Sequence, residues 1–177
     1  MIGAVSASDA DNILTDDDPG AFVPDEPIIV DEGDDGSNIK EIYVNDTGDD
    51  SNIGSAESPY ATIGKAISNI TDSDKATIYL SEGTFASDND TTFNIQLSHK
   101  SNGGSLAIIG AGADKTIVDG QSAFRFAYLE YDTNVTLKDI TFINFKQGNG
   151  GVLYGYGILT IENCVFKDSY ATNNRGG

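Results

Sequence analysis

The sequence predicts an all-β fold in which short strands stack as successive coils of a β-solenoid. Short segments rich in β-branched and aromatic residues follow one another after residue 76, bounded by Gly, Asn, Asp and Ser. No helical spacing separates them, which excludes a doubly wound α/β fold. Residues 135–144 also match residues 159–168 at a constant offset of 24, and internal periods of this length are typical of stacked coils.

The predicted strands begin with one at 40–44, which is followed by a turn at 45–52. The others lie at 77–80, 93–97, 106–109, 116–118, 124–129, 135–137, 140–143, 152–154, 158–161 and 164–166. An earlier, looser copy of the repeat lies at 106–108, which is 29 residues before 135–137. The pair Gly150 and Gly151 recurs at Gly176 and Gly177.

One short helix is predicted between the first two strands. Ser58 and Pro59 suit its start, because serine caps helices and proline fits the first turn. Apolar residues then recur at the i, i+3, i+4, i+7 spacing of one helix face, at Ile63, Ala66, Ile67 and Ile70. We expect a helix of about 10 residues that covers the first coil, because the open end of a solenoid needs a cap.

Stacked coils bring equivalent residues together, because inward positions alternate along each strand. The offset of 24 predicts three stacked pairs: Leu137 with Ile161, Ile140 with Cys164, and Phe142 with Phe166. Cys164 is therefore predicted to be a core residue and not a reactive thiol. Asn144 and Asp168 are predicted to stand at turns, where their side chains satisfy backbone groups.

The charge is concentrated at the start of the chain. The 177 residues include 28 acidic and 10 basic side chains, giving a formal net charge of −18, and residues 1–39 hold 11 of the acids and no Lys or Arg. Such a balance repels phosphate backbones and anionic membrane surfaces. We expect no nucleic-acid partner and no membrane contact. The single Cys and the single His, His99, exclude an intrachain disulfide framework and Cys- or His-based metal sites.

Residues 1–7 end in small residues and resemble the tail of a secretory signal peptide, with a native N-terminus as the alternative. We predict that they are a signal-peptide remnant and that the parent protein is exported. Residues 8–39 are predicted to form a disordered acidic arm, because their composition buries too little surface to offset chain entropy. The one apolar cluster of this arm, at 28–30, is predicted to be part of the solvated linker. The alternative is that it adds a short strand to the domain that follows.

The residues from about 40 onward resemble a known superfamily. Segments 42–52, 58–63 and 65–67 resemble the N-terminal cap of right-handed parallel β-helix proteins of the pectate-lyase-like superfamily, and 106–110 with 115–120 resemble their first complete coil. Segments 150–154 and 159–166 look most like adhesin-like surface proteins of methanogenic archaea. They are also similar to the Gly-Gly and Phe-x-x-Asn repeats of polymorphic membrane proteins, although Ser169 stands where that pattern has Asn.

This resemblance implies a right-handed parallel β-helix with an N-terminal capping strand and a short helix. Residues 40–177 are then the cap and first coils of a β-helix truncated at its C-terminal end, because the repeat starts again at Gly176. The implied function is that of a non-enzymatic, extracellular cell-surface adhesin whose β-helix serves as a stalk or as a binding module for polysaccharide or a partner cell. Exposed tyrosines that stack on sugars would suit such a binding module, and ordinary packing is the alternative role for them. The candidates are Tyr128, Tyr131, Tyr154, Tyr156 and Tyr170.

An exported glycoprotein is also indicated by four Asn-x-Ser/Thr sequons, at Asn45, Asn69, Asn89 and Asn134. They are the candidate glycosylation sites.

The enzymatic alternative is a polysaccharide lyase, epimerase or glycoside hydrolase, since one fold hosts many functions. Its active site would then lie outside or late in this fragment. The nearest charge pairings are typical of a solvated face: Arg125 with Glu130 or Asp132, and Lys138 with Asp139. No catalytic residue and no cofactor is therefore predicted. A calcium site is a third possibility, at Asp46, Asp49, Asp50 and Asn52, where a tight Asx turn is favoured.

Overall fold

The computed structural model describes residues 38–72, 74–86, 95–97 and 104–175. The chain divides into two units, Met1–Glu32 and Gly33–Gly177, and every described residue belongs to the second. The predicted signal remnant at 1–7 and most of the predicted acidic arm lie outside the described residues, as do Asn89 and His99.

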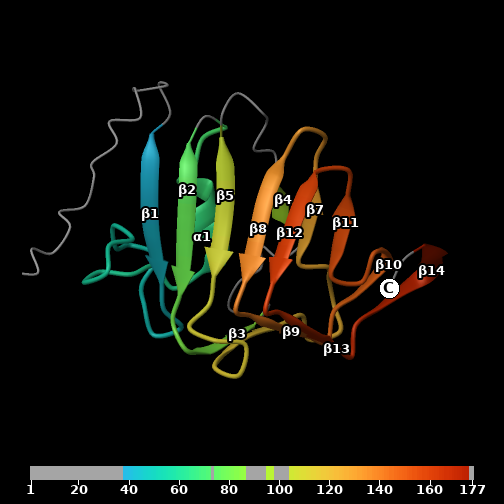
Figure 1. The fold of residues 1–177 in the computed structure, drawn as a ribbon. Helices are drawn as coiled ribbons and strands as arrows, with labels where there is room; N and C mark the ends of the chain where they lie inside the picture. The colour runs from blue at the N-terminus through green and yellow to red at the C-terminus, as the bar shows by residue number, and fades with distance from the viewer. Residues whose placement is uncertain (1–37, 73, 87–94, 98–103, 176–177) are drawn as a thin grey trace, which may run out of the picture. The chain divides into compact units, whose positions relative to one another are not determined.

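The described part is built almost entirely from parallel strands. A five-stranded sheet has the order β1 (Ile39–Val44), β2 (Lys75–Leu80), β5 (Ser105–Ile109), β8 (Asn134–Lys138) and β12 (Ile158–Glu162), and these strands lie side by side in Figure 1. A four-stranded sheet contains β13 (Val165–Lys167), β9 (Thr141–Ile143), β6 (Thr116–Asp119) and β3 (Gly83–Ala86). A three-stranded sheet contains β11 (Leu153–Gly155), β7 (Ala127–Leu129) and β4 (Ile95–Leu97), and β10 (Lys146–Asn149) pairs with β14 (Tyr170–Arg175).

From β2 onward, the chain visits the sheets in a repeating order. It passes from the five-stranded to the four-stranded and then to the three-stranded sheet, and each new visit adds one parallel strand beside the previous one. In the later circuits, β10 and β14 follow the four-stranded sheet. We call one such passage a circuit. The predicted all-β fold of short parallel strands is thereby confirmed.

The register follows the repeat found in the sequence. Ile161 pairs with Leu137 and Phe166 with Phe142, both 24 residues apart. The two phenylalanine rings stack with centroids 5.2 Å apart and planes 9° apart. Leu106 pairs with Val135, which confirms the looser copy at an offset of 29.

The core lies on the inner face of these sheets. Alternation along β8 buries Val135 and Leu137 while Thr136 stays half-exposed, and β5 repeats the pattern with Leu106 and Ile108. Each fully buried aliphatic or aromatic side chain contributes about 1.5–3 kcal/mol relative to an exposed one. Stacking the same inward positions from circuit to circuit therefore produces one continuous core.

The single helix of the described part, α1 (Ile63–Ser68), is shorter than predicted and begins later. Its N-cap is Thr62, whose side chain accepts a hydrogen bond from the Lys65 backbone NH, so the expectation of Ser58 as the cap is wrong. The reason is that Tyr60 is held in a parallel β-bridge with Val44 and cannot be helical.

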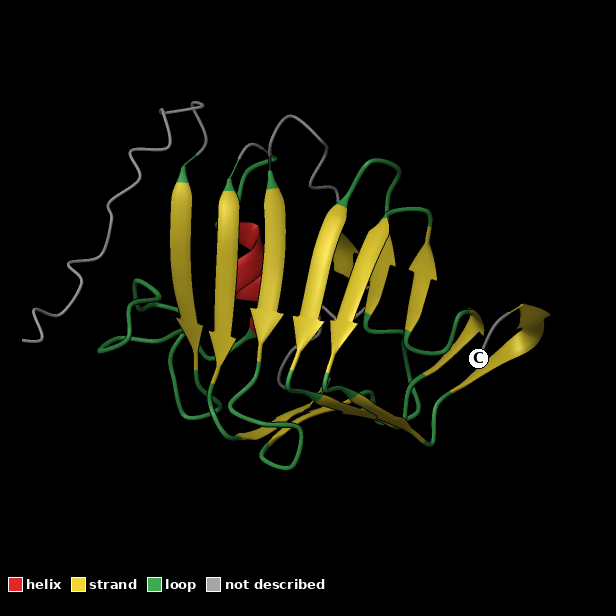
Figure 2. Ribbon diagram, in the orientation of Figure 1, coloured by secondary structure: helices red, strands yellow, loops and turns green. Residues whose placement is uncertain are grey.

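Helix α1 lies on the core side of the five-stranded sheet (Figure 2), and its Ile63 and Ala66 are fully buried. Ile67 and Ile70 pack against the same cluster, so all four predicted apolar positions face the core. With six residues, this helix is too short to cross a membrane.

Three strands were not expected from the sequence: β3, β10 and β14. Their segments are polar or glycine-containing, as in Lys-Gln-Gly-Asn for β10 and Tyr-Ala-Thr-Asn-Asn-Arg for β14. Pairing with a neighbouring circuit supplies their backbone hydrogen bonds, and propensity alone does not reveal that partner. The predicted strand at 124–129 is reduced to β7.

The turns between sheets use residues with positive φ. Asn144 and Asp168 have φ of 57° and 51° and stand at bends between strands, as predicted. The Asn144 amide donates to the Asp119 carboxylate at 3.0 Å and not to a backbone group as expected. Gly150 has φ of 60°, and a Cβ atom there would collide with the Leu153 carbonyl. The glycine pair before Val152 is therefore required by the turn.

Candidate functional site

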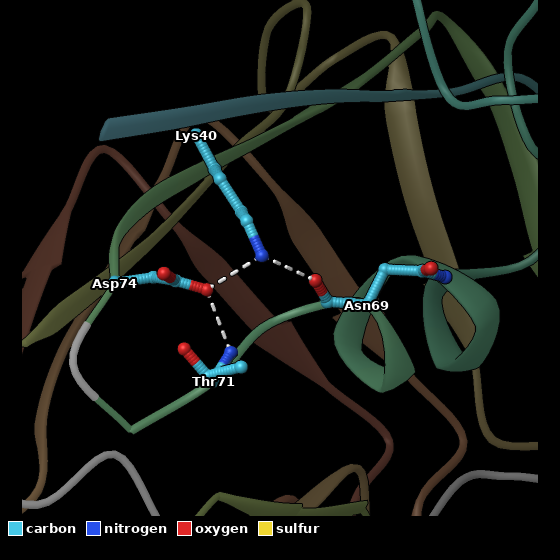
Figure 3. A network of polar contacts seen from close by, with 4 residues as sticks. All are labelled: Lys40, Asn69, Thr71 and Asp74. Carbon is cyan, nitrogen blue, oxygen red and sulfur yellow. Dashed lines mark hydrogen bonds and ion pairs between the residues drawn. The ribbon is translucent and has the colours of Figure 1, made fainter. Parts of the chain in front are cut away.

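A buried acidic residue joins three elements of the cap region. The carboxylate of Asp74, at the start of β2, accepts hydrogen bonds from Lys40 Nζ at 2.8 Å and from the Thr71 backbone NH at 2.7 Å. Lys40 Nζ also donates to the backbone carbonyl of Asn69 at 2.9 Å, just after α1, as Figure 3 shows. This arrangement ties β1, α1 and β2 together.

The charge of Asp74 is stabilised in spite of its burial. Burial by itself raises the pKa of the carboxyl, but hydrogen bonds from Lys40 and Thr71 outweigh it, so the pKa is lowered from its ordinary value. Its second oxygen, Oδ1, has no hydrogen-bond partner within the described residues. We interpret this group as a structural clasp of the cap.

Two carboxylates of the cap loop accept hydrogen bonds from backbone NH groups. Asp50 accepts hydrogen bonds from the backbone NH groups of Ala61 and Thr62 at 2.9 and 3.0 Å. Asp49 accepts from the Ser51 backbone and hydroxyl, both at 2.8 Å, and these bonds lower the pKa of Asp49. Among the described residues, no group of three or more His, Cys, Asp or Glu side chains is placed to hold a metal ion.

Asn52 completes this loop by donating from its side-chain amide to the Pro59 carbonyl at 2.8 Å. The Asp46 carboxylate lies close to Gly83 at the start of β3. Of the four predicted residues, Asp49 makes the Asx-turn bond, to the backbone two residues further on, whereas Asp50 and Asn52 join the loop to the segment before α1.

The charged residues considered as candidates for an enzyme site contact groups other than those predicted. Lys138 forms an ion pair with Glu162 at 3.2 Å, one circuit further on, whereas Asp139 accepts a hydrogen bond from Asn163. Arg125 Nη1 donates to the Asn149 carbonyl at 3.0 Å. Each of these three contacts joins residues 24 apart, so applying the repeat offset to polar residues would have found them.

Cys164 lies where the core prediction places it. It is half-buried and packs against the core cluster, and its thiol contacts the Glu162 carbonyl at 3.3 Å. Burial raises the pKa of this thiol, which keeps it protonated at neutral pH.

Four of the five singled-out tyrosines gather on one surface, which we call the tyrosine face: Tyr128, Tyr131, Tyr154 and Tyr156. Tyr154 is at its centre, with ring centroids 5.9 Å from Tyr128 and 6.3 Å from Tyr156. Tyr131 and Tyr156 stack in parallel at 4.3 Å. The Arg125 guanidinium lies 5.4 Å from the Tyr154 ring centre, in cation–π geometry.

The fifth tyrosine, Tyr170, lies on β14 with Lys146 Nζ 5.3 Å from its ring centre. The two outermost rings of the tyrosine face are well exposed, at 64% for Tyr131 and 54% for Tyr156. Tyr131 lies in the turn before β8 and Tyr156 in the bend before β12. Contiguous exposed apolar surface of this kind is typical of binding surfaces.

A hollow of about 490 Å³ adjoins the tyrosine face. Tyr156 forms one wall and Ile158 another, and polar groups line the rest, at Lys75, Gly104, Ser105, Asp132, Thr133 and Asn134. An apolar wall with a few convergent polar groups is the usual composition of a small-ligand site. Sequence reasoning missed this hollow, because its walls come from four different segments.

The sequons occupy different environments. Asn45 is half-buried in the cap loop, Asn69 is exposed at the C-terminal end of α1, and Asn134 is exposed as the first residue of β8. A second hollow, of about 390 Å³, lies at the last circuit beside Ile161 and Phe166, which are 45% and 41% exposed.

The described fold defines an all-β protein of stacked parallel strands with one short capping helix. The chain belongs to the family described as Protein of unknown function (DUF1565), whose model matches residues 46–162. This family is associated with parallel β-helices, in agreement with the β-helix part of the sequence resemblance.

Comparison with individual proteins adds one solved structure. A rhamnogalacturonan lyase is similar to this chain with a TM-score of 0.47 and 16% identity, over 63% of this chain and 31% of that protein. The chain thus spans about a third of that structure. No curated protein matches the chain significantly.

Proposed function

We propose that this chain is part of a non-enzymatic, extracellular adhesin-like protein whose parallel strands form a right-handed β-helix and whose tyrosine face binds a polysaccharide. The tyrosine face is the observation that carries the proposal. Export is supported by the signal-peptide resemblance of residues 1–7, and the β-helix by the family and by the repeating order of the sheets.

The chemistry of this face suits sugar rings. Tyrosine rings offer apolar surface for the CH groups of a pyranose and a hydroxyl for hydrogen bonding. The neighbouring hollow adds Ser105 and Asp132, whose side chains complement sugar hydroxyls. Because the formal net charge is −18, we expect the ligand to be a neutral polysaccharide.

Affinity electrophoresis of the full chain against soluble neutral polysaccharides tests the binding. Tyr154→Ala removes the centre of the tyrosine face and is expected to weaken binding about tenfold, a loss of about 1.4 kcal/mol. Tyr43→Ala is the control, because Tyr43 stacks on Tyr79 at 5.1 Å on the cap strands, outside the tyrosine face. Equal losses in both variants, or no retardation by any polysaccharide, would contradict the proposal.

The non-enzymatic part needs a separate assay. Prolonged incubation with neutral and uronic-acid polysaccharides is expected to release neither new reducing ends nor unsaturated products. Either product, made by purified protein and absent with heat-treated protein, would instead support the lyase or hydrolase alternative, and a changed ratio of uronic-acid epimers would support the epimerase alternative.

A further inference from the structure

The three sequons in the described part differ in how well the fold tolerates a sugar. Asn45 is half-buried, and its Oδ1 accepts hydrogen bonds from the Thr47 backbone and hydroxyl at 3.0 and 2.9 Å. Asn69 is exposed, but its Nδ2 donates to the Lys65 carbonyl at 2.8 Å and so helps to end α1. A glycan replaces one hydrogen of the Asn Nδ2 group. At Asn69 this directly disturbs the hydrogen bond to the Lys65 carbonyl.

Asn134 is placed differently. Strand alternation buries Val135, which is 1% exposed, and turns Asn134 and Thr136 outward on the same side of β8. Asn134 is exposed, and its carboxamide has no hydrogen-bond partner among the described residues. A sugar on this nitrogen therefore costs the fold no contact.

Apolar surface surrounds this residue. Ile158 pairs with Asn134 in the neighbouring strand and is 68% exposed, and Tyr156 lines the same hollow with 54% exposure. Ile158 lies on the outward side of β12, where exposed aliphatic surface stays in contact with water unless something covers it.

We propose that Asn134 carries an N-linked glycan and that its first sugar packs on Ile158. In the transfer step, Asn134 Nδ2 bonds to the anomeric carbon of a lipid-diphosphate-linked oligosaccharide. The bond from that carbon to the diphosphate oxygen breaks, the lipid diphosphate leaves with the bonding electrons, and one amide proton passes to a base. The inference rests on the export that belongs to the proposed function, and it does not depend on polysaccharide binding by the tyrosine face.

The test is secretion of the full chain from a eukaryotic host, followed by peptide mapping after release of glycans in ¹⁸O-water. We expect label at position 134 in most molecules. Asn134→Gln and Thr136→Ala are each expected to abolish glycosylation at this position, whereas Asn69→Gln leaves it unchanged. Secreted, folded protein with an unmodified Asn134 would overturn the proposal.

Packing of the first sugar is tested by a double-mutant cycle with Thr136→Ala and Ile158→Ser. Loss of the glycan through Thr136→Ala is expected to lower the melting temperature by about 2 °C more in the wild-type background than in the Ile158→Ser background. Equal shifts in the two backgrounds would overturn the packing on Ile158. If Asn134 is modified but the protein binds no polysaccharide, this inference stands and the proposed function is rejected. If the protein binds polysaccharide but Asn134 is unmodified, the proposed function stands and this inference is rejected.

Discussion

At the scale of single residues, Asp74 is the one Asp, Glu, Lys or Arg that is buried among the described residues. Its side chain has 0% exposure, yet its pKa is lowered because Lys40 and Thr71 donate hydrogen bonds to it. Burying a charge is tolerated only when partners of this kind are present. The stability of the cap therefore depends on this one carboxylate.

Asp74→Asn keeps the side-chain shape but removes the charge. We expect the free energy of unfolding at pH 7 to fall by about 2–3 kcal/mol, the usual contribution of hydrogen bonds to a charged group. Because the folded-state pKa lies below the ordinary value of 3.8, this stabilisation is complete above that pH and is lost as the pH falls through the lower folded-state pKa.

Urea unfolding of the wild type and of Asp74→Asn at pH 7 and at pH 3 measures this difference. The gap between the two proteins should narrow at pH 3. Asp72→Asn is the control, since Asp72 is exposed. A gap of the same size at both pH values would show that Asp74 is not ionised in the folded state.

At the scale of elements, stacking determines which aromatic residues matter. Phe142 is fully buried, with ring centroids 5.0 Å from Phe126 and 6.3 Å from Phe145. Phe166 occupies the equivalent position on β13 but is 41% exposed. Two residues that the repeat makes equivalent therefore contribute unequally, because within the described residues β9 has a paired strand on both sides and β13 on one side.

Phe142→Ala should lower the free energy of unfolding by about 3–5 kcal/mol, the range for a deleted core phenylalanine. Phe166→Ala should cost less than half as much, because its ring remains partly in water. Chemical denaturation of the two variants measures both values, and similar losses would mean that the last circuit is as well packed as the one before it.

The ion pair between β8 and β12 is a surface contact. Lys138 and Glu162 are 43% and 51% exposed, and pairs of this kind contribute between about 0 and 1 kcal/mol. Glu162→Gln is expected to change the melting temperature by less than about 2 °C. A larger drop, persisting at 1 M salt, would indicate a contact beyond charge attraction.

At the scale of the whole molecule, the charge and the described fold are separable. Residues 1–37 contain 11 of the 28 acidic residues and no Lys or Arg, and the described core is formed by later residues. The described unit thus carries a modest excess of negative charge. The folded part is expected to keep its stability without the acidic segment.

Removing residues 1–37 tests this separation. We expect the melting temperature to change by less than about 2 °C, while the variant elutes much earlier from an anion-exchange column than the full chain. Calorimetry and chromatography of the two proteins provide the measurements. A marked loss of stability would mean that the segment packs on the fold.

The sequence by itself determined the strand type, the stacking register and the core. Strand alternation has a period of two, and the offset of 24 aligns Leu137 with Ile161 and Phe142 with Phe166. Both features can be read from the order of residues along the chain. It also located α1, although not its first residue, because the bridge between Tyr60 and Val44 is a contact between distant segments.

Only the tertiary structure decided the burial of Asp74, the strands β3, β10 and β14, and the assembly of the tyrosine face. Tyr128 meets Tyr154 at an offset of 26 and Tyr131 meets Tyr156 at 25, so the main repeat does not align them. The offset between stacked residues depends on the lengths of the turns between strands, and these turns differ in length from one sheet of the circuit to the next. The surface on which the proposed function rests therefore depends on how the circuits close.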